Sequence, residues 1–167
     1  MTLLETDLAY PGQIIREDLF WAGHTTKEPD SCELRDQMFS ALLTDLTIVV
    51  VEDHDDARRY LRVFLDRLGA KVVVARNGFE GLDAIKSNHP NMVLSDIAMP
   101  GMDGFELLRQ IRALDAAPSA RVPVVAMSAF FTDADRAQVL YAGFKACLPK
   151  PFSPEKLVET ILNVLHD

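Results

Sequence analysis

The chain has little cysteine, no excess of positive charge and no long apolar run. Its 167 residues include only two cysteines, Cys32 and Cys147, too few for a disulfide framework. The net charge of -8 at pH 7 repels nucleic-acid phosphates and does not suit anionic membranes. No window approaches a membrane span, and the start lacks the basic and apolar regions of a signal peptide. We therefore expect a cytoplasmic protein that binds neither nucleic acid nor membrane.

The composition suits a packed globular domain, since 49% of the residues are apolar and 25% are charged. From Leu46 onward, short apolar runs alternate with segments of helical spacing. Residues 46–51 form a continuous, mainly β-branched apolar run, which is typical of a strand buried on both faces of a parallel sheet. Further strands are predicted at 71–75, 91–96, 122–127 and 144–148.

A helix is predicted after each strand, and most of these helices have a capping residue. Asp55 or Asp56 can cap the first, Asp103 and Glu106 can form a capping box for the third, and Thr132 and Ser153 can cap the last two. Five strand–helix repeats predict an α/β fold, a five-stranded parallel sheet with helices on both faces in a flavodoxin-like sandwich.

Residues 1–44 precede this alternation and contain no chemical motif. Two stretches have helical spacing of apolar residues, one at 12–22 and one that begins after Asp30 and reaches Leu43. We interpret 1–44 as a short N-terminal extension, helical or partly disordered, ahead of a domain at 45–167. It could be a loosely packed arm, a docking or dimerisation element, or mostly absent in the cell if translation begins at Met38.

Charged and polar side chains follow the predicted strands at their carboxyl ends. Glu52 and Asp53 follow the first strand, Asp96 ends the third, Ser128 follows the fourth and Lys150 follows the fifth. Open parallel sheets place their chemistry at these ends, so the five side chains are expected to share one crevice.

Three acids in one crevice repel one another unless a cation lies among them, and Mg²⁺ prefers such oxygen ligands. Lys150 can neutralise a further anion, and Ser128 can donate a hydrogen bond to it. A carboxylate such as Asp96 is a known nucleophile for a phosphoryl group, giving an aspartyl phosphate. The pattern therefore predicts a site that receives a phosphoryl group, mainly through positioning and charge neutralisation.

Four motifs at these strand ends carry a family resemblance: Val51-Glu52-Asp53, Ser95-Asp96-Ile97-Ala98-Met99-Pro100-Gly101-Met102-Asp103-Gly104, Met127-Ser128-Ala129 and Lys150-Pro151-Phe152. With them, residues 46–167 resemble the receiver domain of bacterial two-component response regulators. The resemblance implies that Asp96 is the phosphoacceptor and that Ser128 and Lys150 contact the phosphoryl oxygens. It also implies a Mg²⁺ site formed directly by Asp53 and Asp96, with Glu52 acting through water and the backbone carbonyl of Ala98 as a further ligand.

The resemblance implies a signalling module rather than an enzyme. Its phosphoryl donor would be a phosphohistidine on a sensor histidine kinase or phosphotransfer protein, and its output would pass to a downstream protein partner. It also implies a cis Lys150–Pro151 bond. One rival is a degenerate receiver that serves only as a binding module, against which the intact acids argue. A second is an Asp-nucleophile phosphatase, which would need an acid where Ala98 stands.

One position departs from the family pattern. Receivers commonly carry Tyr or Phe three residues before the lysine, as a side chain that turns inward on activation, and this chain has Cys147 there. A cysteine moves little volume when it turns. We therefore expect the phosphorylated state to be read through the loop at 129–132, which carries Phe130 and Phe131, and the helix after it, and not through Cys147.

Overall fold

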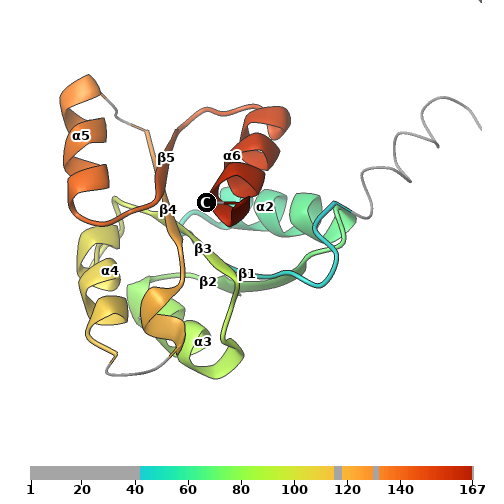
Figure 1. The fold of residues 1–167 in the computed structure, drawn as a ribbon, viewed down its shortest axis with the longest axis horizontal. Helices are drawn as coiled ribbons and strands as arrows, with labels where there is room; N and C mark the ends of the chain where they lie inside the picture. The colour runs from blue at the N-terminus through green and yellow to red at the C-terminus, as the bar shows by residue number, and fades with distance from the viewer. Residues whose placement is uncertain (1–41, 115–117, 130–131, 167) are drawn as a thin grey trace, which may run out of the picture.

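Five parallel strands form one sheet, in the order β2-β1-β3-β4-β5 (Figure 1). The computed structural model describes residues 42–114, 118–129 and 132–166. The sheet confirms the predicted architecture and topology. Its strands are β1 (Thr47–Val51), β2 (Lys71–Ala75), β3 (Met92–Asp96), β4 (Val124–Ser128) and β5 (Ala146–Pro149).

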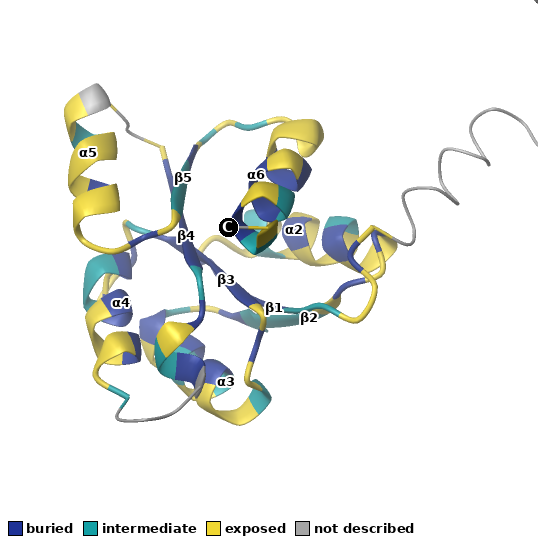
Figure 2. Cartoon of the chain, in the orientation of Figure 1, coloured by how far each residue is buried: buried dark blue, intermediate teal, exposed yellow. Residues whose placement is uncertain are grey.

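Helices cover both faces of the sheet, and each face has its own apolar core (Figure 2). On one face, Leu61 and Leu65 meet Leu157 and Ile161 over the central strands. On the other, the core includes Ile85 and Leu107. The first face is covered by the helices α2 (Asp55–Arg67) and α6 (Pro154–His166). The second face is covered by α3 (Gly78–Asn88), α4 (Gly104–Arg112) and α5 (Asp133–Tyr141). A short 3-10 helix, η1 (Pro118–Arg121), precedes β4.

The predicted cap of α2 is wrong. His54 is the N-cap residue and makes no side-chain capping bond, while Asp55 and Asp56 lie in the first turn. Negative charge there interacts favourably with the exposed amides of the helix N-terminus, so these acids stabilise α2 without capping it.

The predicted capping box of α4 forms only in part. Asp103 accepts a hydrogen bond from the backbone of Glu106 at 2.7 Å, as expected. The Glu106 carboxylate, however, accepts from the side chains of Arg109 and Gln110 and is not paired with the Asp103 amide. A complete box occurs instead at α5, between Thr132 and Asp135.

Within the described residues, no helix combines the length and apolar character needed to cross a bilayer.

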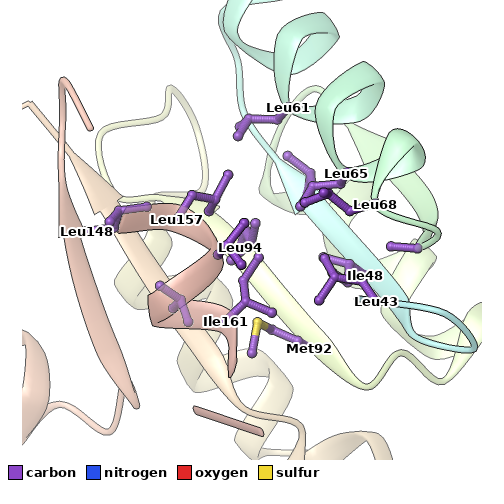
Figure 3. Close-up of a cluster of buried hydrophobic side chains, with 14 of the residues drawn as sticks. Leu43, Ile48, Leu61, Leu65, Leu68, Met92, Leu94, Leu148, Leu157 and Ile161 are labelled. Carbon is purple, nitrogen blue, oxygen red and sulfur yellow. The ribbon is translucent and has the colours of Figure 1, made fainter. Parts of the chain in front are cut away.

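Leu43 is part of the core, although it precedes the first strand. Its side chain is fully buried, and its amide donates to the carbonyl oxygen of Leu68 at 2.9 Å. Figure 3 shows it beside Ile48, close to Leu68 at the end of α2. The amphipathic stretches predicted between residues 12 and 41 lie outside the described residues, and the boundary near residue 44 stays a prediction.

Leu43→Ala is expected to lower the free energy of unfolding by about 3 kcal/mol, because it removes a fully buried side chain and leaves a cavity. Urea titration of the full chain measures this change. The neighbouring Leu42 is 40% exposed, so Leu42→Ala is the matched control and should change stability by less than about 0.5 kcal/mol. Equal effects of the two substitutions would show that Leu43 contributes no more than an exposed residue.

Candidate functional site

The ends of four neighbouring strands bring the predicted site residues to one edge of the sheet. In the strand register, Val51 pairs with Ser95 and Asp96 pairs with Met127. Ser128, in turn, pairs with Pro149, the residue before Lys150. Glu52 and Asp53 follow β1 directly, so all the predicted side chains start from adjacent strand ends.

Three of these side chains form a compact acidic cluster. Glu52, Asp53 and Asp96 each offer a carboxylate oxygen, and the three oxygens lie within 4.8 Å of one another. Glu52 is 1% exposed and Asp96 is 7% exposed, whereas Asp53 faces solvent. Three carboxylates this close, two of them buried, repel one another, and a nearby cation lowers this repulsion. Hard carboxylate oxygens, with one acid open to solvent, fit a Mg²⁺ ion that keeps some of its water.

Lys150 supplies one cation to this cluster. Its Nζ lies 2.6 Å from Oε2 of Glu52 and 3.2 Å from Oδ2 of Asp96. Burial alone would lower the pKa of the Lys150 ammonium, but the hydrogen bond and charge of Glu52, together with Asp96, outweigh it and raise the pKa. The ammonium is therefore charged at neutral pH and neutralises part of the acidic cluster. The sequence pattern predicts contact of Lys150 with a phosphoryl anion but gives no sign of its ion pair with Glu52.

The backbone around Asp96 is held tightly against β4 and α4. The amide of Ile97 donates to the carbonyl oxygen of Met127 at 3.0 Å, and the amide of Ala98 lies 3.4 Å from Oδ1 of Asp96. Gly104 opens α4 directly beneath, where a Cβ atom would lie 2.6 Å from the carbonyl oxygen of Asp96. Only glycine permits this approach, so the start of α4 fixes the strand end that carries Asp96.

Ser128 and Lys150 are linked through their backbones. Ser128 is buried at the end of β4, and its carbonyl oxygen accepts from the amide of Lys150 at 2.7 Å. The Lys150–Pro151 peptide bond is cis, as the family resemblance implied. The structure therefore brings Glu52, Asp53, Asp96 and Lys150 into one cluster and places Ser128 and Ala98 beside it.

Cys147 is half-buried at β5 and packs at the edge of the second core. Burial raises the pKa of its thiol, so it behaves as a small apolar side chain. Phe130 and Phe131, on which the expected readout depends, lie outside the described residues. The role of the 129–132 loop stays a prediction.

Arg58 is a site residue that sequence reasoning missed. Its guanidinium donates to the carbonyl oxygens of both Glu52 and Asp53. One signal was available: helical side chains lean towards the helix N-terminus, so a long cationic residue in the first turn of α2 can reach back to the acidic turn before it.

Known proteins resemble this chain over most of its length. A sequence model described as the response regulator receiver domain matches residues 48–162. An uncharacterised 14.6 kDa protein of Leptolyngbya boryana is 38% identical over 119 residues, which make up 71% of this chain and 89% of that protein. The polar-differentiation response regulator DivK of Brucella ovis is 29% identical over 121 residues, covering 72% of this chain and 97% of DivK.

Among solved structures, the fold is similar to the receiver domain of a sensor histidine kinase from Pseudomonas aeruginosa. The two share a TM-score of 0.66 and 27% identity, over 73% of this chain and 98% of that one. A magnesium ion is coordinated in the active-site cleft of the Pseudomonas domain.

Proposed function

The chain belongs to the response regulator receiver family, and we propose that Asp96 accepts a phosphoryl group from a phosphohistidine in the presence of Mg²⁺. The observation that supports this most directly is the cluster itself. Three carboxylates lie within 4.8 Å of one another, and the ammonium of Lys150 bridges two of them. A receiver of this kind is a phosphoacceptor module rather than a classical enzyme.

In the proposed transfer, a carboxylate oxygen of Asp96 forms a bond to phosphorus while the phosphorus–nitrogen bond of the donor breaks. The imidazole leaves with the electron pair of that bond and takes up a proton. Bound Mg²⁺ would neutralise charge on the phosphoryl oxygens. Lys150 and Ser128 would contact the same oxygens, and the ammonium of Lys150 would shift from Glu52 and Asp96 towards the new anion.

The proposed metal ligands differ in exposure in a way that suits their roles. Asp53 faces solvent and Asp96 lies beside it, so both can bind the ion directly. Glu52 is buried and paired with Lys150, which suits contact with the ion through water. The carbonyl oxygen of Ala98 is the further ligand in this proposal.

The proposed partners follow from the same chemistry. The donor is a sensor histidine kinase or a histidine phosphotransfer protein in the cytoplasm, and the phosphorylated domain then changes its contacts with a downstream protein or with a second copy of itself. All the proposed site residues lie within residues 45–167, and none lies in the extension before them. Leu43 precedes this range but packs in the core of the domain.

Incubation with acetyl phosphate and Mg²⁺ tests the proposal without knowledge of the kinase. We expect intact mass spectrometry to show one added phosphoryl group and a chelator to prevent its addition. Absence of both Mg²⁺ binding and the adduct would contradict the proposal and favour a degenerate receiver that only binds proteins. Turnover of a generic phosphate ester would instead indicate a phosphatase.

A further inference from the structure

The side chain of Arg58 closes the turn between β1 and α2, which carries two of the three clustered acids. Its Nη1 donates to the carbonyl oxygen of Glu52 at 2.8 Å and to that of Asp53 at 3.3 Å. Its Nη2 pairs with the carboxylate of Asp55. Although it is an arginine next to a surface loop, its side chain is only 12% exposed. One guanidinium thus contacts three residues of this turn, Glu52, Asp53 and Asp55.

Local helix stability does not account for an arginine at this position. Arg58 is in the first turn of α2, where the helix dipole disfavours a cation. Its salt-bridge partner Asp55 is 85% exposed, and an ion pair with such an exposed partner contributes little to stability. Within the described part of the chain, its guanidinium also makes two charge-assisted hydrogen bonds to main-chain carbonyl oxygens, those of Glu52 and Asp53.

We propose that Arg58 is a positioning residue that orients Glu52 and Asp53 for Mg²⁺. This inference rests on the proposed function. Lys150 and Arg58 have different roles near the cluster. Lys150 donates to the carboxylate oxygens of Glu52 and Asp96. Arg58 donates to main-chain carbonyl oxygens of the turn between β1 and α2. Arg58 thereby fixes the backbone of Glu52 and Asp53 and leaves the solvent-exposed carboxylate of Asp53 available for the ion.

The geometry requires a guanidinium. Its nitrogens reach the two carbonyl oxygens and the Asp55 carboxylate together, and the planar group keeps these donors in fixed directions. A lysine at this position would keep the positive charge but could not hold all three partners in this arrangement. Loss of a group that orients metal ligands typically weakens metal affinity about 10–100-fold.

The test is a Mg²⁺ titration of the full chain by calorimetry, with thermal unfolding of each variant measured without metal. We expect Arg58→Gln to raise the Kd for Mg²⁺ by about 10-fold or more and Arg58→Lys to give an intermediate Kd. Arg62→Gln is the matched control, since Arg62 lies on the same helix, is 58% exposed and pairs with Asp66 at 3.7 Å. The control should keep the Kd of the unmodified protein.

Amide exchange at residues 52–54 gives a second readout that does not depend on the metal. Faster exchange in this turn in both Arg58 variants, with slow exchange retained in β3, supports local positioning. If Arg58→Gln lowers the melting temperature but binds Mg²⁺ as tightly as the unmodified protein, Arg58 is only a scaffold residue and the inference is wrong. The proposed function would survive that result, whereas an unmodified protein that does not bind Mg²⁺ would overturn both. Should Arg58→Gln not fold, the Kd of Arg58→Lys decides, and a value equal to that of the unmodified protein refutes the inference.

Discussion

Asp96→Asn is expected to abolish the phosphoryl adduct that acetyl phosphate forms in the presence of Mg²⁺. The substitution keeps the size and shape of the side chain but replaces the nucleophilic carboxylate with an amide. It also removes one of the three charges that favour a cation at the cluster. The fold should persist, because Lys150 keeps its shorter contact, the one with Glu52 at 2.6 Å. Intact mass spectrometry measures the adduct, and circular dichroism checks that the variant is folded.

Asp103→Asn is the matched control for this experiment. Asp103 is an exposed acid close to the site along the chain, and its side chain caps α4. Asparagine caps a helix as well as aspartate, so this variant should form the adduct in normal amounts. An adduct of undiminished yield on Asp96→Asn, or one that peptide mapping places on Asp53, would show that the phosphoacceptor is another residue.

Much of the fold could be predicted because its determinants are local. The run at 46–51 is β-branched from Thr47 onward, and the structure places β1 inside the sheet, between β2 and β3. Motifs at strand ends also predicted which side chains would share an edge, because in a parallel sheet that edge follows from strand direction alone. Asp96 and Lys150 could therefore be placed together although they lie 54 positions apart in the chain.

The details of the site depend on contacts that no local pattern encodes. The ion pair between Glu52 and Lys150 joins residues 98 positions apart in the chain. Its 2.6 Å distance depends on how β1 and β5 are placed in the sheet, with β3 and β4 between them. In the sequence, nothing distinguishes Arg58 from the other polar residues of an amphipathic helix. Its contact with the preceding turn exists only in the folded structure. Leu43 lay in a segment read as an extension, and only its packing near Leu68 shows that it belongs to the core.

The pair between Glu52 and Lys150 leads to the second large effect. Glu52 is 1% exposed, and the side chain of Lys150, whose ammonium neutralises it, is 22% exposed. The raised pKa of Lys150 means that folding favours its charged form. Its contribution to stability is therefore complete below the pKa of the unfolded state and is lost as the pH rises through the higher pKa of the folded state. At neutral pH the full contribution is present.

Lys150→Met is expected to lower the free energy of unfolding at pH 7, without metal, by about 3–5 kcal/mol. The substitution keeps an unbranched side chain but leaves Glu52 as a buried charge without its ammonium partner. Urea titration in the presence of a chelator measures the change. Lys156→Met is the control, because Lys156 and its partner Glu159 are both more than half exposed, and that pair should contribute less than about 1 kcal/mol.

Glu52→Gln combined with Lys150→Met separates the buried charge from a general loss of packing. When both charged partners are replaced, no unpaired charge remains, so the double variant should be more stable than Lys150→Met alone by about 2 kcal/mol or more. Mg²⁺ should likewise stabilise Lys150→Met more than it stabilises the double variant, since the ion can replace the ammonium beside an ionised Glu52. If the double variant unfolds at the same urea concentration as Lys150→Met, the loss comes from packing around the lysine stem, and the ion pair does not stabilise the fold.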